Sequence, residues 1–164
     1  MLNKYLLSIP IFLLLIFSCS TNQVDLESEH QQVKMVLDDF IVAHETKDLD
    51  LLSSCFSVKP DILILGTDKD ELWVDKKSMV DAQRRAYAAF DKVKLSVREK
   101  VLKMDKSGKT SWFYMKVDWF VESKGEKYKF DDVRTTGVLE NVGDKWQIVQ
   151  IHTSLPVEGK AVSY

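Results

Sequence analysis

The side chains of this chain that could do chemistry gather in its C-terminal half, on a predicted β-sheet. Turn sequences at Lys106-Ser107-Gly108 and Lys124-Gly125 set which strand residues face each other in two hairpins. In that register an otherwise apolar face also holds Glu99, Asp132 and Arg134. Buried charges must be paired or must face a cavity. The cluster therefore indicates either a ligand pocket or an ion-pair network that only closes the open end of the sheet.

The two turns fix the predicted register of both hairpins. The turns are assigned independently, yet their apolar residues fall on one face, which supports the assignment. Glu99 and Arg134 are then about two strand spacings apart, roughly 10 Å, a gap that an arginine can cross. The predicted pairs are Trp119 with Phe130, Val117 with Asp132, Met115 with Arg134, Leu95 with Trp119, Val97 with Val117, and Glu99 with Met115.

The last hairpin allows two registers. If Asn141-Val142-Gly143 forms a three-residue loop, His152 lies opposite Asp132 on the concave face, and Gln150 lies opposite Arg134. A two-residue loop would instead turn Val149 and Ile151 inward and His152 outward. We favour the three-residue loop, because its glycine takes the same third position as Gly108.

This arrangement supports three functional hypotheses. In the first, the domain binds a small, partly apolar ligand, with Arg134 holding a carboxylate or similar oxyanion. In the second, Asp132 orients His152 as a general base in an isomerase or dehydratase, and Arg134 stabilises the oxyanion. In the third, the protein only docks protein partners. The expected ligand-binding residues are Glu99, Met115, Trp119, Phe130, Asp132, Arg134, Gln150 and His152.

Composition and motifs exclude several other classes. The 23 basic and 25 acidic residues give a net charge of −2, so nucleic acid is not an expected partner. No glycine-rich phosphate loop and no metal-ligand spacing occurs, and we expect neither cofactor nor metal. Cys55 is expected to be a small buried apolar group rather than a nucleophile. His30 and His44 are expected on the surface or at the core edge.

The elements that position these residues are helices first and strands afterwards. A helix is expected from a capping box at Ser28 and Gln31, a short second helix from Asp48, and a third from Asp75 or Ser78. A short strand is expected at residues 62–65. Four long strands follow at roughly 92–105, 109–123, 126–140 and 144–154, and strands of this length normally bend. The fold class is therefore α+β, a curved antiparallel sheet packed on about three N-terminal helices.

The N-terminus resembles a bacterial lipoprotein signal. A basic start at Lys4 precedes a short apolar run that ends at Ser18-Cys19. Residues 16–19, IFSC, look like a lipobox, which implies cleavage before Cys19 and acylation of that cysteine. We therefore expect a signal peptide at 1–18, a lipidated tether at 19–27 and a membrane-anchored, extracytoplasmic location in the bacterial cell envelope. The alternative is an ordinary cleaved signal peptide with an incidental cysteine.

The opposite face of the predicted sheet is too apolar to be fully solvated. Trp112, Tyr114 and Phe120 alternate there with Lys116 and Asp118. Either a further helix or a second copy of the chain covers such a face, and a symmetric homodimer is the simpler hypothesis.

The order of elements resembles the nuclear transport factor 2-like superfamily, in its SnoaL-like branch. The resemblance spans roughly residues 28–157 and implies a cone-shaped domain with a cavity between sheet and helices, followed by a tail at 158–164. The superfamily includes isomerases, cyclases, dehydratases and binding domains, so the fold alone does not give the function. The segments that carry the likeness are 47–50 KDLD, 60–67 PDILILGT, 134–139 RTTGVL and 145–156 KWQIVQIHTSLP.

Overall fold

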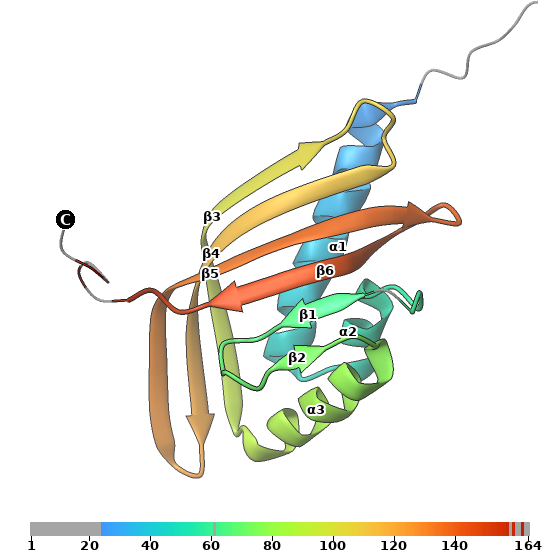
Figure 1. Cartoon of the computed structure of the whole chain (residues 1–164). Helices are drawn as coiled ribbons and strands as arrows, with labels where there is room; N and C mark the ends of the chain where they lie inside the picture. The colour runs from blue at the N-terminus through green and yellow to red at the C-terminus, as the bar shows by residue number, and fades with distance from the viewer. Residues whose placement is uncertain (1–23, 61, 158, 160–161, 163–164) are drawn as a thin grey trace, which may run out of the picture.

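Three helices pack against one face of a six-stranded sheet in the computed structural model (Figure 1). The structure describes residues 24–60, 62–157, 159 and 162. The predicted signal peptide, the lipidation site at Cys19 and most of the C-terminal tail lie outside these residues. The elements in chain order are α1 (Leu26–Thr46), α2 (Leu49–Cys55), β1 (Leu63–Leu65), β2 (Leu72–Trp73), α3 (Lys76–Ala89), β3 (Lys92–Met104), β4 (Thr110–Ser123), β5 (Glu126–Val142) and β6 (Lys145–Ser154).

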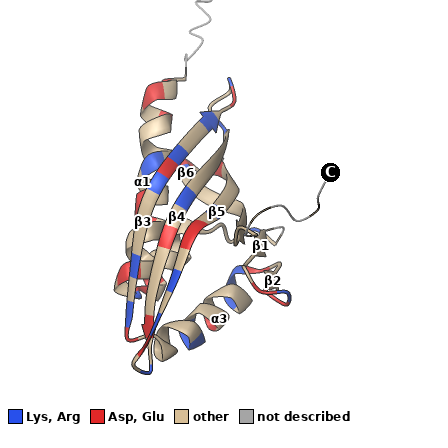
Figure 2. Ribbon diagram, turned by 90° about the vertical axis from the view of Figure 1, so that its left-hand side faces the viewer, with Lys and Arg blue, Asp and Glu red and all other residues tan. Residues whose placement is uncertain are grey.

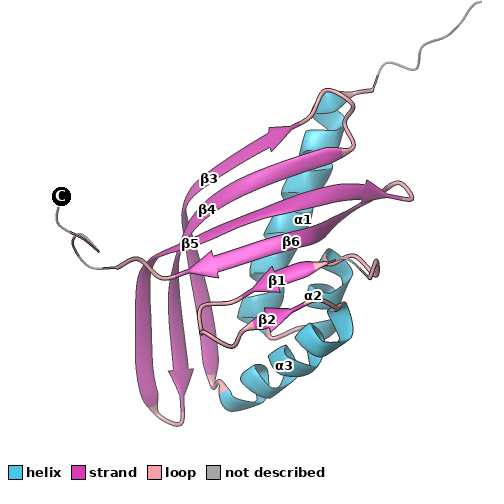
Figure 3. Ribbon diagram, in the orientation of Figure 1, coloured by secondary structure: helices cyan, strands magenta, loops and turns pink. Residues whose placement is uncertain are grey.

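The sheet is strongly curved and mixed rather than wholly antiparallel. Its strand order is β2-β1-β6-β5-β4-β3, and the helices lie on its concave side (Figure 3). β1 runs parallel to β6. The chain after α2 places β1 at the edge of the long-stranded meander. The two-residue strand β2 was not expected from the sequence. The α+β class and the curved sheet on three helices are confirmed.

Aspartate side chains begin all three helices. Asp48 caps α2 and Asp75 caps α3, as the sequence indicates. The cap of α1 is Asp25, whose carboxylate accepts from the Ser28 backbone N–H at 3.1 Å, so the predicted capping box at Ser28 is wrong. An earlier acceptor in the chain satisfies the same helix terminus, and α1 starts three residues before the expected boundary.

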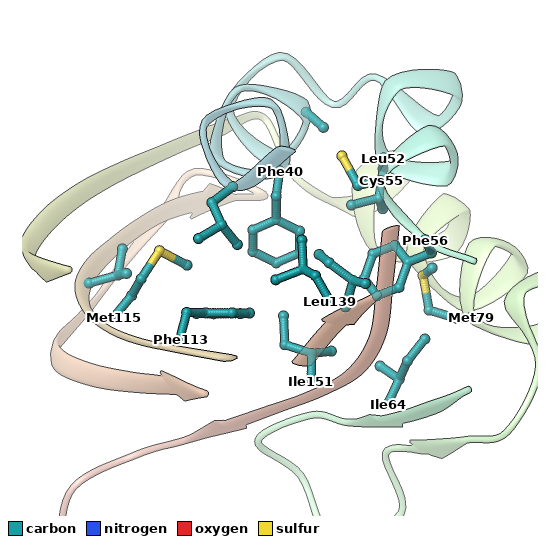
Figure 4. Packing of buried hydrophobic residues seen from close by; sticks show 14 of the residues in the cluster. Phe40, Leu52, Cys55, Phe56, Ile64, Met79, Phe113, Met115, Leu139 and Ile151 are labelled. Carbon is teal, nitrogen blue, oxygen red and sulfur yellow. The ribbon is translucent and has the colours of Figure 1, made fainter. Parts of the chain in front are cut away.

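The core lies between the three helices and the concave face of the sheet (Figure 4). One face of α1 supplies buried residues at helical spacing, among them Leu37 and Phe40. They meet Phe56 after α2 and Leu139 of β5, both almost fully buried. Burying each such side chain contributes roughly 1.5–3 kcal/mol relative to leaving it in water. This packing fixes α1 against the sheet.

Two β-bulges bend the long strands midway along their length. Arg98 is the extra residue of β3, between the pairs Val97–Val117 and Glu99–Lys116. On β5 the extra residue falls between Phe130 and Val133, where Asp132 has a φ of 57°. Bulges raise the local twist and bend a strand, and the lower arms of β3, β4 and β5 turn away from the upper sheet at this level (Figure 1).

These bulges overturn half of the predicted register. Below them the pairs Trp119–Phe130, Leu95–Trp119 and Val97–Val117 are confirmed. Above them every residue of β3 and β5 is shifted by one, so Val117 pairs with Val133 and Met115 with Thr135 and Lys100. A shift of one residue turns each side chain to the other face of the sheet. Glu99, Asp132 and Arg134 therefore lie on the outer face, not on the concave one.

The last hairpin also differs from the register that we favour from the sequence. Val142 pairs with Lys145 around a two-residue turn, Gly143-Asp144, in which both residues have positive φ. Two positive φ values are typical of the type I′ turn, which matches the twist of a hairpin. Ile151 is buried and His152 is exposed opposite Thr136, as the two-residue alternative predicts, whereas Val149 sits at a third bulge and Ile148 points into the core instead.

Candidate functional site

A cavity of about 530 Å³ lies between the concave sheet and the helices. It occupies the lower half of the molecule, below the bulges, where α3 and the β1–β2 hairpin face the bent arms of β4 and β5 (Figure 1). Its walls are mainly apolar and aromatic. They include Phe40, Phe56, Met79, Phe90, Trp119 and Phe130. This size and this lining are typical of small-molecule sites.

Two of the eight predicted ligand-binding residues, Trp119 and Phe130, line this cavity. Met115 is fully buried in the core above it. Gln150 pairs with Val138 and is not part of the lining. The prediction that all eight residues converge on one pocket is therefore wrong, because the bulges separate the upper register from the lower one.

The predicted charged cluster is dispersed over the outer face. Glu99 accepts from the Lys116 ammonium at 2.7 Å, and the Arg134 guanidinium donates to the Leu155 carbonyl at 3.1 Å. Asp132 and His152 are both exposed. His152 lies opposite Thr136, four residues from Asp132 along β5, or about 13 Å in an extended strand. The geometry does not support the predicted Asp132–His152 pair as catalytic machinery.

His44 is the titratable side chain that reaches the cavity from α1. It lies one helical turn after Phe40 with 6% of its surface exposed, so of the two expected positions the surface is wrong and the ring lies at the edge of the core, against the cavity. Its Nδ1 lies 3.0 Å from the Tyr87 hydroxyl, which donates to the Ala43 carbonyl at 3.3 Å. Burial lowers the pKa of His44 to about 4, so the ring is neutral at pH 7.

The hydrogen-bond pattern around His44 decides what the ring can offer a ligand. The single proton of the Tyr87 hydroxyl can go to the Ala43 carbonyl or to His44 Nδ1, and where it goes to Ala43 the Tyr87 oxygen accepts from His44 Nδ1–H. In that tautomer Nε2 is an acceptor, and it has no hydrogen-bond partner among the described residues. His44 could therefore accept a hydrogen bond, or a proton, from a molecule in the cavity. Its place at i+4 from Phe40 on an apolar helix face is the sequence signal that could have marked it.

Trp119 stands beside His44 with an unsatisfied donor. The two ring centroids are 5.1 Å apart, at an interplanar angle of 66°. The indole Nε1 of Trp119 is buried and has no hydrogen-bond partner in the described part of the chain. A buried donor without a partner costs about 1–3 kcal/mol, and such groups in native proteins cluster where a ligand or water completes the site.

The mouth of the cavity is acidic. The loop between β1 and β2 brings Asp68 and Glu71 into the lining. Glu71 Oε2 accepts from the Asp68 backbone N–H at 3.1 Å, and the Glu71 carbonyl accepts from the Gly66 N–H at 2.9 Å. A Cβ on Gly66 would stand 2.0 Å from Glu71 Oε2, so only glycine leaves room for this carboxylate. The hairpin has no clear sequence signal, because β2 has only two residues.

Cys55 is not a candidate nucleophile. The thiol is buried and donates to the Leu51 carbonyl at 3.3 Å. Burial raises its pKa to about 12, so it is a thiol and not a nucleophilic thiolate at pH 7. The prediction of a small buried group is confirmed. Within the described ranges, no group of three or more His, Cys, Asp or Glu side chains is placed to hold a metal ion.

A second, more open depression of about 510 Å³ lies beside the start of α3. Lys76 and Lys77 line it, but their ammonium groups are already engaged. Lys76 donates to the Ser53 and Phe56 carbonyls, and Lys77 pairs with Asp81 at 2.7 Å. These contacts fasten the end of α2 to α3, which makes this depression a structural junction and the weaker candidate.

The chain forms a cone-shaped domain with an apolar cavity under a bent sheet, an architecture that known protein families share. The model of the SnoaL-like domain matches residues 33–158. The chain belongs to the SnoaL-like domain family. That match begins within α1 and spans the other two helices, the cavity lining and all four long strands, and it confirms the family resemblance. Among curated protein sequences, none matches the chain.

Solved structures share the SnoaL-like fold at low sequence identity. A nuclear transport factor 2-like superfamily protein from Salmonella enterica aligns with a TM-score of 0.74 at 14% identity, over 84% of this chain and 99% of that chain. A proposed dehydratase of the same superfamily from Streptomyces avermitilis gives 0.70 at 15% identity, over 80% and 98%. A proposed scytalone dehydratase from Novosphingobium aromaticivorans gives 0.70 at 8% identity, over 80% and 86%. At these identities the likeness establishes the fold alone.

Proposed function

We propose that this SnoaL-like protein binds a small, partly apolar ligand in the cavity between its sheet and α3. The observation that carries the proposal is a cavity of about 530 Å³ with aromatic walls and a few convergent polar groups. His44 offers a hydrogen-bond acceptor, and Trp119 has a donor without a partner. The oxyanion-binding role expected of Arg134 is no part of this proposal, because that side chain lies outside the cavity.

Extraction of the natural ligand tests this function. Ala86 of α3 lines the cavity, whereas Ala88 is exposed on the same helix and does not. The full-length protein, Ala86→Phe and Ala88→Phe would each be purified from the native host, and organic extracts compared by mass spectrometry. The proposal expects a molecule that accompanies the wild type and Ala88→Phe but is lost from Ala86→Phe. Identical extracts from all three would contradict it.

The second candidate function is proton-transfer catalysis of the isomerase or dehydratase type. The buried, neutral His44 favours it, because an imidazole with a free acceptor beside an apolar cavity can act as a general base. Two of the structural relatives above are proposed dehydratases, which supports the same class. In D₂O the wild type would exchange an acidic C–H of the extracted ligand, and His44→Gln would not. Equal exchange by both would remove His44 as the base.

We also propose that the chain is lipid-anchored in the bacterial cell envelope, on the basis of its N-terminal sequence. None of the helices in the described ranges is long and apolar enough to cross a membrane. Val24, at the start of the described chain, lies against Gly108 in the β3–β4 turn. The cavity is at the other end of β4, near Tyr128 and the β4–β5 turn. An anchor on Cys19 would thus hold the cavity away from the bilayer.

The outer face of the sheet supports a homodimer as the partner interaction. Trp112 and Val101 lie near one another there, each 47% exposed, with Tyr114 opposite Val101. The three helices lie on the other side of the sheet, and the outer face shows mixed charges along β3, β4 and β5 (Figure 2). Both signs of charge around an aromatic centre suit a self-complementary interface.

A further inference from the structure

We propose that the ligand of this cavity is an apolar amine, a molecule with an aromatic or alicyclic body and a cationic ammonium group held at the mouth. This inference rests on the proposed function, since it names the chemical class of ligand for the same cavity. Four features of the lining carry it: its charge, the fixed position of one carboxylate, its exposed aromatic rings and the polar side chains deeper inside.

The charge of the lining is of one sign. Asp68 and Glu71 line the cavity, and no lysine or arginine does among the described residues. Neither carboxylate is in a salt bridge with a described residue. Lys69 belongs to the same loop but is exposed and outside the lining. Lys47 donates to the carbonyl of Phe90 at 2.7 Å, yet its side chain is not part of the lining either. Such a field favours a cation and disfavours a carboxylate ligand.

The Glu71 carboxylate is held in place rather than free in solvent. Its Oε2 accepts from the Asp68 N–H, and the missing side chain of Gly66 gives it space against the backbone of β1. A carboxylate fixed by a backbone donor and a glycine loses less side-chain entropy when a cation binds. Its remaining acceptor positions are open to an ammonium group, which carries three donors.

Exposed aromatic rings line the same cavity. Tyr128 and Phe130 of the bent β5 arm line the cavity and are 42% and 39% exposed. The face of an aromatic ring attracts a cation, with about 0.5–1 kcal/mol at exposed sites. Aromatic rings in a cavity that also holds unpaired carboxylates are therefore a suitable environment for an alkyl ammonium group, and they also cover the apolar body of the ligand.

His44 adds a polar group to the interior. It is more than nine-tenths buried, lines the cavity, and has an Nε2 without a partner among the described residues. In the tautomer in which Tyr87 donates to the Ala43 carbonyl this nitrogen accepts a hydrogen bond, and in the tautomer in which Tyr87 donates to Nδ1 it donates one. A hydroxyl on the body of the ligand would satisfy it in either tautomer. With His44 and the unpartnered indole N–H of Trp119, the interior can hydrogen-bond a polar group on the body of the ligand, while the carboxylates at the mouth take its cation.

Three probes of nearly equal shape test the inference: naphthylethylamine, naphthylethanol and naphthylacetate. Each would be titrated by fluorescence against a soluble form beginning at residue 20, which contains every described helix and strand. We expect the amine to bind at least tenfold more tightly than the acetate, with the alcohol between them. The advantage of the amine should shrink as salt is raised, because the mouth is exposed to solvent.

Charge-neutral variants connect this preference to the mouth. Glu71→Gln keeps an acceptor for the Asp68 N–H and should weaken amine binding severalfold while leaving the alcohol unchanged. The matched control is Asp70→Asn, which removes the same charge from the same loop but lies outside the lining. Asp70→Asn should leave the amine within about twofold of wild type. Equal weakening by both variants would show a diffuse field and overturn the specific site.

The outcomes separate this inference from the proposed function. If all three probes bind equally and Glu71→Gln changes nothing, the cavity binds small molecules but does not select amines, and the inference fails alone. If naphthylacetate binds most tightly, the inference fails as well. If none of the probes binds and the extracts of the proposed-function experiment are identical, the cavity is not a ligand site and both fail.

Discussion

At the scale of single residues, burial rather than residue type decides which polar side chains are candidates for the functional site. His152 and His44 are both isolated histidines in the sequence. The alternation of β6 favours His152 as the functional histidine, but it is His44 that reaches the cavity. His44 lies on the buried face of α1, packed edge-on against Phe40 at 4.6 Å between ring centroids. A polar ring on an apolar helix face is a stronger indication of a site than a polar ring on a strand of uncertain register.

The neutral state of His44 makes stability depend on pH. Burial lowers its pKa from 6.5 to about 4, so between these values the unfolded chain binds more protons and folding weakens as pH falls. The full loss is about 3 kcal/mol. His44→Gln lacks this component, so its deficit in free energy of unfolding against wild type should shrink from pH 7 to pH 4. Urea denaturation measures both proteins, and a constant deficit would contradict the buried neutral histidine.

At the scale of elements, the bulges of β3 and β5 shape the molecule. Asp118 of β4 joins them, since it accepts from the Arg98 guanidinium at 2.5 Å and from the Asp132 backbone N–H at 3.1 Å. These two donors, the backbone N–H foremost, lower the pKa of Asp118. The ion pair of Asp118 with Arg98 and its hydrogen bond to the Asp132 backbone therefore hold the bend in the sheet above the cavity.

The positive φ of Asp132 can be tested by substitution. Asp132→Gly removes the steric cost of a left-handed residue and should leave the free energy of unfolding unchanged or raised. Asp132→Val places a β-branched side chain there and should lose roughly 1–2 kcal/mol. Asp131→Val is the matched control on the same exposed stretch, without positive φ. Equal losses for both valine variants in urea denaturation would argue against a bulge at Asp132.

At the scale of the whole molecule, the sequence predicts architecture well and the site poorly. Helical spacing, caps at Asp48 and Asp75 and glycine turns place all three helices and the four long strands. Bulges leave no such mark, because Arg98 and Asp132 are ordinary polar residues in ordinary alternation. One extra residue per strand keeps the fold but reverses the faces above it. Trp119 and Phe130 were placed correctly because they lie below the bulges.

The proposed dimer gives a prediction at this scale. Trp112→Asp puts a charge at the centre of the outer face, and it should turn a dimeric soluble form into a monomer in sedimentation velocity. Phe113, the next residue, is buried on the inner face and stays untouched, so the fold should persist by circular dichroism. A wild type that sediments as a monomer at high concentration would rule out the dimer.

The proposed lipid anchor predicts in which cell fraction the protein is found. Cys19→Ala removes the acyl acceptor of the lipobox-like sequence and should move the protein from the membrane fraction to the soluble one. Fractionation of bacterial cells that express both forms measures this shift. A variant that remains in the membrane fraction would contradict lipid attachment at Cys19.

The claim that the cavity takes a small ligand is tested most directly by naphthylethanol, which carries no charge and so avoids any question of amine selectivity. Its binding would be titrated by fluorescence in wild type, Ala86→Phe and Ala88→Phe. The account predicts saturable binding to wild type and Ala88→Phe, and at least tenfold weaker binding to Ala86→Phe, whose new ring fills the cavity from α3. Equal binding to all three proteins would show that the molecule binds elsewhere, and the cavity would lose its proposed role.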